Sequence, residues 1–145
     1  MDNLIRLSCC ISTTDAAVPL GIEIWLDDRC IFDQPWVRET IEWSYSMLDD
    51  DAEHELRWVL KNKTQDHTKI DLRGNILQDS RLILKDISII DIPLEYIVTQ
   101  NSRYRHDHNG TTELADHPFY GEMGCNGTVS LKFTTPIYLW LLEHL

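Results

Sequence analysis

The sequence predicts an all-β fold, an antiparallel β-sandwich of jelly-roll type that ends in a short C-terminal helix. Apolar residues recur at every second position in several runs, as in strands that bury one face. Turn-forming residues separate these runs at intervals of about eight to twelve residues, as they do in sandwiches. The helical pattern comes last, after Thr135 and Pro136.

The strands are predicted in order along the chain. The run "LIRLSCCIS" places Ile5, Leu7, Cys9 and Ile11 on one face. The same alternation occurs in "LGIEIWLD", "TIEWSYSM", "HELRWVLK" and "TVSLKFT". The isoleucine-rich run "RLILKDISIIDI" is typical of a buried strand.

Short polar segments connect the predicted strands. Asp27–Asp28–Arg29 and Asp49–Asp50–Asp51 each link two runs, and Asn109–Gly110 and Asn126–Gly127 are tight-turn signals. Thr135 can cap the final helix, Pro136 suits its first turn, and "IYLWLLEHL" follows. No linker or repeat divides the 145 residues, so residues 1–145 are predicted to form a single domain.

Composition excludes several classes of partner. A net charge of −11 without a basic cluster repels phosphate backbones and anionic bilayers, so we expect no nucleic acid and no membrane partner. The apolar run "PIYLWLLEHL" has about half the length of a membrane-spanning helix. The four cysteines include no C-x-x-C pair, which disfavours a zinc or redox motif and suggests reduced thiols in a protein that folds inside a cell.

The segment 102–127 contains the candidate metal ligands. Asp107, Asn109, Asp116 and Glu122, joined by Asn126, carry the oxygen ligands that calcium accepts in loose loop geometries. The alternative is that Asp and Asn occur there because they favour turns. We therefore expect either no cofactor or calcium.

A second metal pattern in this segment points to a different chemistry. His106, His108 and Glu113 match the H-x-H-x4-E spacing of cupin jelly rolls, which bind iron, manganese or zinc. The second, glycine-led cupin motif with its later histidine is missing, so a cupin-like metalloenzyme is the weaker alternative. The stretch "YGEMGCNG" lacks the lysine of a phosphate loop and is interpreted as a bend in which Glu122 can act as a ligand. No complete catalytic set is present, and we expect a non-catalytic protein.

Two tryptophans are candidate binding residues. Trp25 lies on the strand face opposite Ile22, Ile24 and Leu26, and Trp36 follows a proline in a predicted loop. Exposed aromatic side chains serve either protein interfaces or sugar stacking. The sequence leaves both roles open.

Several stretches resemble a group of small acidic virion structural proteins of tailed cyanobacterial phages (cyanophages). These are "GIEIWLDDRCIFDQ", "HELRWVLKNKT", "RHDHNG" and above all "FYGEMGCNGTVSLKFTTPIYLWLLE". The resemblance implies a capsid-decoration or tail-associated protein in the virion, assembled in the host cytoplasm. It further implies contacts with other virion proteins and a homo-oligomer.

In shape the chain is also similar to jelly-roll carbohydrate-binding modules, some of which hold sugar hydroxyls through calcium. This resemblance is one of fold and transfers no residue. It implies the alternative function, a calcium-assisted module that binds host-surface polysaccharide.

Overall fold

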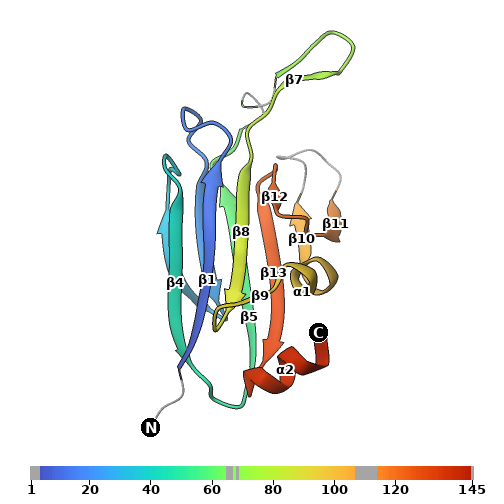
Figure 1. The fold of residues 1–145 in the computed structure, drawn as a ribbon. Coiled ribbons are helices and arrows are strands. Elements are labelled where there is room, and N and C mark those ends of the chain that lie inside the picture. The colour runs from blue at the N-terminus through green and yellow to red at the C-terminus, as the bar shows by residue number, and fades with distance from the viewer. Residues whose placement is uncertain (1–3, 65–66, 68, 107–113, 145) are drawn as a thin grey trace.

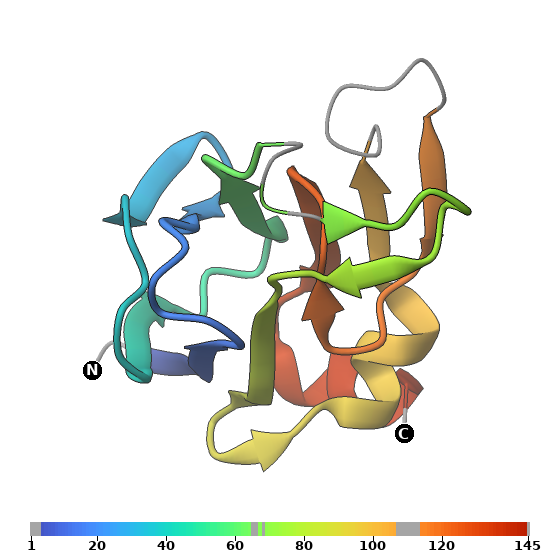
Figure 2. The ribbon, with the colours of Figure 1, turned by 90° about the horizontal axis from the view of Figure 1, so that it is seen from above.

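The structure is a computed structural model that describes residues 4–64, 67, 69–106 and 114–144, and it has the predicted β-sandwich (Figure 1). Two antiparallel sheets pack face to face, and we call them the front sheet and the back sheet. Viewed from above, the two sheets lie opposite one another (Figure 2).

The front sheet has the strand order β12-β8-β1-β4, with β9 paired to β8. Its strands are β1 (Leu4–Thr13), β4 (Ile41–Leu48), β8 (Leu82–Ile89), β9 (Ile92–Pro93) and β12 (Glu122–Met123). β1 pairs with β4 from Leu4 opposite Leu48 to Ile11 opposite Ile41. β1 also pairs with β8, and β8 pairs with β12, so among the described strands both β1 and β8 are interior strands of this sheet.

The back sheet has the order β11-β10-β13-β5-β2-β3. Its strands are β2 (Gly21–Leu26), β3 (Arg29–Gln34), β5 (Glu53–Lys61), β10 (Arg103–His106), β11 (Ala115–Pro118) and β13 (Gly127–Thr134). A separate hairpin of β6 (Lys69–Ile70) and β7 (Ile76–Gln78) projects beyond the end of the sandwich (Figure 1).

The core lies between the two sheets and is built from the inward positions of the alternating runs. The predicted inward residues of β1 are buried, since Ile5, Leu7, Cys9 and Ile11 expose at most 4% of their surface. The opposite layer contributes Trp58 from β5 and three residues of β13, which are Val129, Leu131 and Phe133. The period-two pattern therefore identified the buried face correctly, as expected for half-buried antiparallel strands.

Two helices pack against the sandwich, and both contact β13. The predicted C-terminal helix is present as α2 (Ile137–His144), with Ile137, Trp140 and Leu141 buried. A second helix, α1 (Glu95–Asn101), was not predicted. It is only seven residues long, and its β-branched residues Ile97, Val98 and Thr99 favour strands. Burial of Ile97 and Val98 between the layers overrides that preference. Neither helix in the described part of the chain is long and apolar enough to span a membrane.

The stretch 120–127 takes the chain from the back sheet to β12 in the front sheet and returns it to β13 in the back sheet. Gly121 has a φ of +98°, and β12 follows at once on the edge of β8. The turn predicted at Asn126–Gly127 is wrong, because Gly127 is the first residue of β13 and pairs with Leu60. A Cβ at Gly127 would lie 2.3 Å from the carbonyl oxygen of Arg105, so this glycine permits close packing of β13 against β10.

Candidate functional site

A concave site opens between β8, α1 and the stretch that leads into β12, and we call it the β8–α1 cleft. Its volume is about 370 Å³, within the range of small-molecule sites. The buried residues Leu84, Ile87 and Phe119 contribute to its apolar lining. Around them the cleft is lined by polar and aromatic side chains, which are Lys85, Asp86, Glu95, Thr99, Tyr120 and Glu122.

A bulge in β8 places two charged residues of this cleft side by side. The register with β1 runs from Ser8 opposite Ser88 to Cys10 opposite Lys85, so two residues of β8 stand opposite the single residue Cys9. One of these two, Asp86, has a φ of +55°. Both Lys85 and Asp86 are exposed, which breaks the alternation of the strand. Bulges of this kind re-aim side chains and are frequent beside functional sites.

The 119–122 stretch lines the cleft beside β8. Phe119 is 1% exposed and anchors it in the core, whereas the neighbouring Tyr120 is 72% exposed. The positive φ of Gly121 turns the chain back to β8, where the amide of Leu84 donates to the carbonyl of Gly121 at 2.8 Å. Arg81 then fixes the Glu122 carboxylate through a 2.6 Å ion pair. The cleft thus presents an exposed aromatic ring beside an oriented carboxylate.

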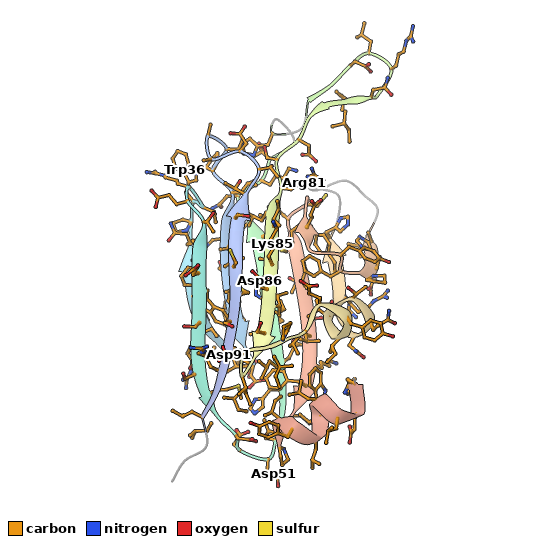
Figure 3. The ribbon with its side chains drawn as sticks, in the orientation of Figure 1. Trp36, Asp51, Arg81, Lys85, Asp86 and Asp91 are labelled. Atoms are coloured by element: carbon orange, nitrogen blue, oxygen red, sulfur yellow. The ribbon has the colours of Figure 1, made fainter. Side chains whose placement is uncertain are left out.

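One residue of the cleft, Asp86, also lines a second hollow, a polar groove across the front sheet. The groove has a volume of about 400 Å³ and runs over the outward side chains of β1, β4 and β8. These are mainly small and polar, and they include Arg6, Ser8, Cys10, Glu42, Ser44 and Ser88. In Figure 3, Lys85 and Asp86 lie midway along β8, with Arg81 near one end of the strand.

The predicted calcium ligands are not brought together within the described residues. Asp116 lies in β11 of the back sheet, and its two carboxylate oxygens accept from Nε of Arg103 at 2.8 Å and Nε of Arg105 at 3.0 Å. The hydrogen bond from Arg103 is the main reason why the pKa of Asp116 is lowered. Glu122 lies in the front sheet and pairs with Arg81. Asp107 and Asn109 lie outside the described residues.

Asn126, the fifth predicted ligand, holds two segments of backbone together. Its side-chain oxygen accepts from the amide of Lys63 at 3.0 Å, and its side-chain nitrogen donates to the carbonyl of Lys63 at 2.6 Å. This exchange ties the start of β13 to the residues after β5. It gives Asn126 a structural role that the sequence did not indicate.

Both predicted binding tryptophans are partly buried and carry an arginine near the ring. Trp25 donates from its indole nitrogen to Glu23 at 2.8 Å, and the Arg57 guanidinium lies 5.5 Å from the ring centroid. The guanidinium of Arg38 lies 3.9 Å from the ring centroid of Trp36. Such cation–π contacts occupy a face that a sugar would otherwise use. Trp36 lies near the end of the sandwich, in the loop region of Figure 3.

The cupin-like pattern has only one member in the described residues. His106 ends β10, whereas His108 and Glu113 lie outside them. Among the residues that the structure does describe, no group of three or more His, Cys, Asp or Glu side chains is arranged to hold a metal ion. His106 faces His117 of the neighbouring strand β11.

Sequence reasoning missed most of the β8–α1 cleft. Lys85, Asp86, Glu95 and Tyr120 were not candidates, although Glu122 was. One signal was present in the sequence, namely the adjacent charges Lys85 and Asp86 inside the otherwise apolar run "RLILKDISII". Two consecutive charged residues cannot both point outward from a regular strand, so they indicate a bulge.

Comparison with known proteins shows a similarity of fold. No protein-family model matches the chain, and no curated protein matches it significantly. Among solved structures, vCBM60 in complex with galactobiose superposes with a TM-score of 0.51 over 89% of this chain and 97% of that one. The likeness is one of fold. The two sequences are only 10% identical, so this carbohydrate-binding module confirms the sandwich architecture and transfers no residue role.

Proposed function

We propose that this domain is a non-catalytic carbohydrate-binding module and that the β8–α1 cleft holds the sugar. The observation that carries the proposal is the exposed ring of Tyr120 on a cleft of about 370 Å³ that also presents carboxylate, ammonium and hydroxyl groups. The fold likeness to vCBM60, whose structure contains galactobiose, supports the same class of function. It also supports binding without catalysis, because that neighbour is a binding module.

The chemistry of the cleft suits a sugar ring. A pyranose has an apolar face of C–H groups, which packs on an aromatic ring such as that of Tyr120, and an edge of hydroxyl groups. Carboxylates accept hydrogen bonds from hydroxyls, and an ammonium donates to them. Asp86, Glu122 and Lys85 supply these groups on the lining of the cleft. The ion pair with Arg81 orients Glu122 before a ligand arrives, which lowers the entropic cost of binding.

The front-sheet groove, which shares Asp86 with the cleft, favours an oligosaccharide over a single sugar. Asp86 lines both hollows, so a chain of sugars bound at Tyr120 can continue across Ser8, Ser44 and Ser88. Small hydroxyl side chains on the sheet surface leave room for a ligand and offer hydrogen bonds to it. We therefore propose a polysaccharide, such as one on a host surface, as the natural ligand class.

Isothermal titration calorimetry against a panel of oligosaccharides tests this proposal, with galactobiose as the first probe. Tyr120→Ala should lower the affinity for any bound sugar by about tenfold, the loss expected for a stacking contact of about 1.4 kcal/mol. Trp25→Ala and Trp36→Ala are the controls and should leave the affinity unchanged. If either tryptophan variant lost sugar binding while Tyr120→Ala retained it, the sugar site would not lie in the cleft. A parallel titration in EDTA tests the calcium assistance that was predicted from the sequence.

A second candidate function is assembly through protein surfaces, as in the virion structural role that the sequence suggested. It is favoured by exposed apolar side chains at two places, on the hairpin (Ile70, Leu72 and Ile76) and on the outer side of α2 (Tyr138, Leu139 and Leu142). Apolar patches of this kind are common at protein contacts. Sedimentation of the wild type and of Leu72→Asp and Leu142→Asp tests it. A homo-oligomer that either substitution dissociates supports assembly, and a monomer at all concentrations opposes self-assembly.

A further inference from the structure

His106 and His117 form a close pair between neighbouring strands of the back sheet. In the antiparallel register, Tyr104 stands opposite His117 and His106 stands opposite Ala115. The two histidines are therefore diagonal neighbours on one face of the sheet, where long side chains reach each other. Their Nε2 atoms lie 3.2 Å apart, and the two rings meet nearly edge to face.

The hydrogen bonding of His117 fixes which of its nitrogens carries a lone pair. Nδ1 lies 2.9 Å from the carbonyl oxygen of Pro118. A carbonyl can only accept, so Nδ1 carries the proton and Nε2 presents its lone pair toward His106. Metal-binding histidines commonly use this arrangement, in which a backbone carbonyl holds one ring nitrogen and leaves the other to bind.

Surrounding groups hold both rings in place. The ring of Tyr104 packs against both of them, with centroid distances of 4.7 Å to His106 and 5.4 Å to His117. The hydroxyl of Tyr104 accepts from the amide of Cys125 at 2.9 Å and donates to the carbonyl of the same residue. Gly127 lies so close that a Cβ there would stand 2.7 Å from the Cβ of His106. The pair is thus positioned by packing before any ligand binds.

We propose that His106 and His117 form a binding site for a divalent transition-metal ion of the zinc, nickel or copper class, with water or an external ligand in the remaining positions. With metal–nitrogen distances of about 2.0–2.1 Å, a separation of 3.2 Å between the two nitrogens gives an angle of roughly 100° at the metal, near the tetrahedral value. Imidazole is a preferred ligand of these metals, whereas calcium takes oxygen ligands. The site therefore differs in chemistry from the predicted calcium ligands, and it does not rest on the proposed sugar binding.

Binding changes the hydrogen bond between the two rings and requires no redox step. Without metal, Nε2 of His117 accepts from the Nε2–H of His106, because the proton of neutral His117 is on Nδ1. With metal, Nε2 of each ring donates its lone pair to the ion, and His106 takes the tautomer that is protonated on Nδ1. Each ring keeps one proton, so the neutral pair neither gains nor loses a proton overall.

Calorimetric titration with Zn²⁺ and Ni²⁺ in the absence of thiol reagents tests the site, together with thermal melts. One metal ion should bind per chain, and at about a hundred times Kd it should raise Tm by several degrees. His106→Gln and His117→Gln should each lower the affinity by about tenfold or more. His67→Gln, a histidine in another loop, should not change it. Far-UV circular dichroism without metal checks that every variant is folded.

Cobalt absorption separates histidine binding from thiol binding. A Co²⁺ complex at this pair should show d–d bands without thiolate charge-transfer bands, and this readout stays informative if one histidine variant does not fold. Three results would overturn the proposal. The first is that the wild type binds no metal, and the second is that both histidine variants bind metal as the wild type does. The third is that His117→Gln still binds metal whereas His108→Gln does not, which would favour the cupin-like pattern.

Discussion

The ammonium group of Lys63 lies 2.5 Å from a carboxylate oxygen of Asp79, although the Lys63 side chain is fully buried. The same ammonium donates to the carbonyl oxygen of Ser80 at 2.8 Å and to that of Gly124. Lys63 follows β5 in the back sheet, whereas Asp79 and Ser80 precede β8 in the front sheet. One cation therefore ties the two sheets together at the end of the sandwich from which the hairpin projects.

Lys63→Met should destabilise the fold by about 3 kcal/mol, which lowers Tm by roughly 10 °C for a chain of this size. The substitution keeps the apolar stem but removes the donor for one carboxylate and two carbonyls. Urea unfolding measures the change. Lys132→Met, on an exposed position of β13, is the matched control and should stay within about 0.5 kcal/mol of the wild type. Equal stability of the two variants would contradict this role of Lys63.

The stability should depend on pH through His54. Its Nδ1 lies 2.7 Å from Asp27 and its Nε2 lies 2.7 Å from Asp50, so both ring nitrogens face carboxylates. Burial opposes protonation of His54, but the hydrogen bonds from the two carboxylates outweigh it and the pKa is raised. The hydrogen bond with His54 is the main cause that lowers the pKa of Asp50.

These two shifts define the pH window. The contribution of His54 to the free energy of unfolding is complete below the ordinary histidine pKa of 6.5. It is lost as pH rises through the raised pKa of the folded state. The contribution of Asp50 to the free energy of unfolding is present above the ordinary aspartate pKa of 3.8. It is lost as pH falls through the lowered pKa of the folded state. Thermal melts from about pH 5 to pH 9 should show Tm falling on the alkaline side. His54→Gln should flatten that decline, and an unchanged decline would show that another group causes it.

Gly127→Ala should destabilise the protein by about 1–3 kcal/mol, because the new methyl group would overlap the backbone of β10. A Cβ there would lie 2.3 Å from the Arg105 carbonyl. Gly124→Ala is a control within the same stretch, since its Cβ would meet side chains at ordinary contact distances, with Arg81 at 3.5 Å and Asp79 at 4.0 Å. We expect that variant to change the free energy of unfolding by less than about 1 kcal/mol. If the two variants lost similar amounts of free energy of unfolding, the close approach of Gly127 to β10 would not be the cause.

Asp86→Gly should weaken sugar binding without destabilising the fold, if the proposed function is correct. The residue has a φ of +55°, which glycine adopts more readily than aspartate does, so the free energy of unfolding should change by no more than about 1 kcal/mol. The carboxylate that lines the cleft is lost, and we expect about tenfold lower affinity. Calorimetry with the sugar that binds the wild type measures this.

Asp51→Gly is the matched control for that substitution. Asp51 has a φ of +56° and lies at the far end of the sandwich from Arg81 (Figure 3). The backbone change is equivalent, but no cleft residue is removed. If Asp86→Gly and Asp51→Gly both weakened sugar binding, the cause would be backbone flexibility and not loss of the Asp86 carboxylate.

Much of the architecture follows from local sequence. The alternation in "LIRLSCCIS" and "TVSLKFT" identifies strands and their buried faces, because a strand between two layers must bury every second residue. The acidic turns at Asp27 and Asp51 were also predicted, and both residues adopt the positive φ that Asp tolerates better than most. The all-β class, the sandwich and the final helix thus came from the sequence alone.

Tertiary structure decided where the functional groups meet. The β8–α1 cleft joins Asp86, Glu95 and Tyr120, which are separated in sequence and come together only because α1 and the 119–122 stretch pack against β8. Likewise, His106 meets His117 because the pairing of β10 with β11 sets the diagonal neighbours. Local periodicity specifies which face of a strand is buried. It does not specify strand order or register, and those two properties determine the composition of every site in this protein.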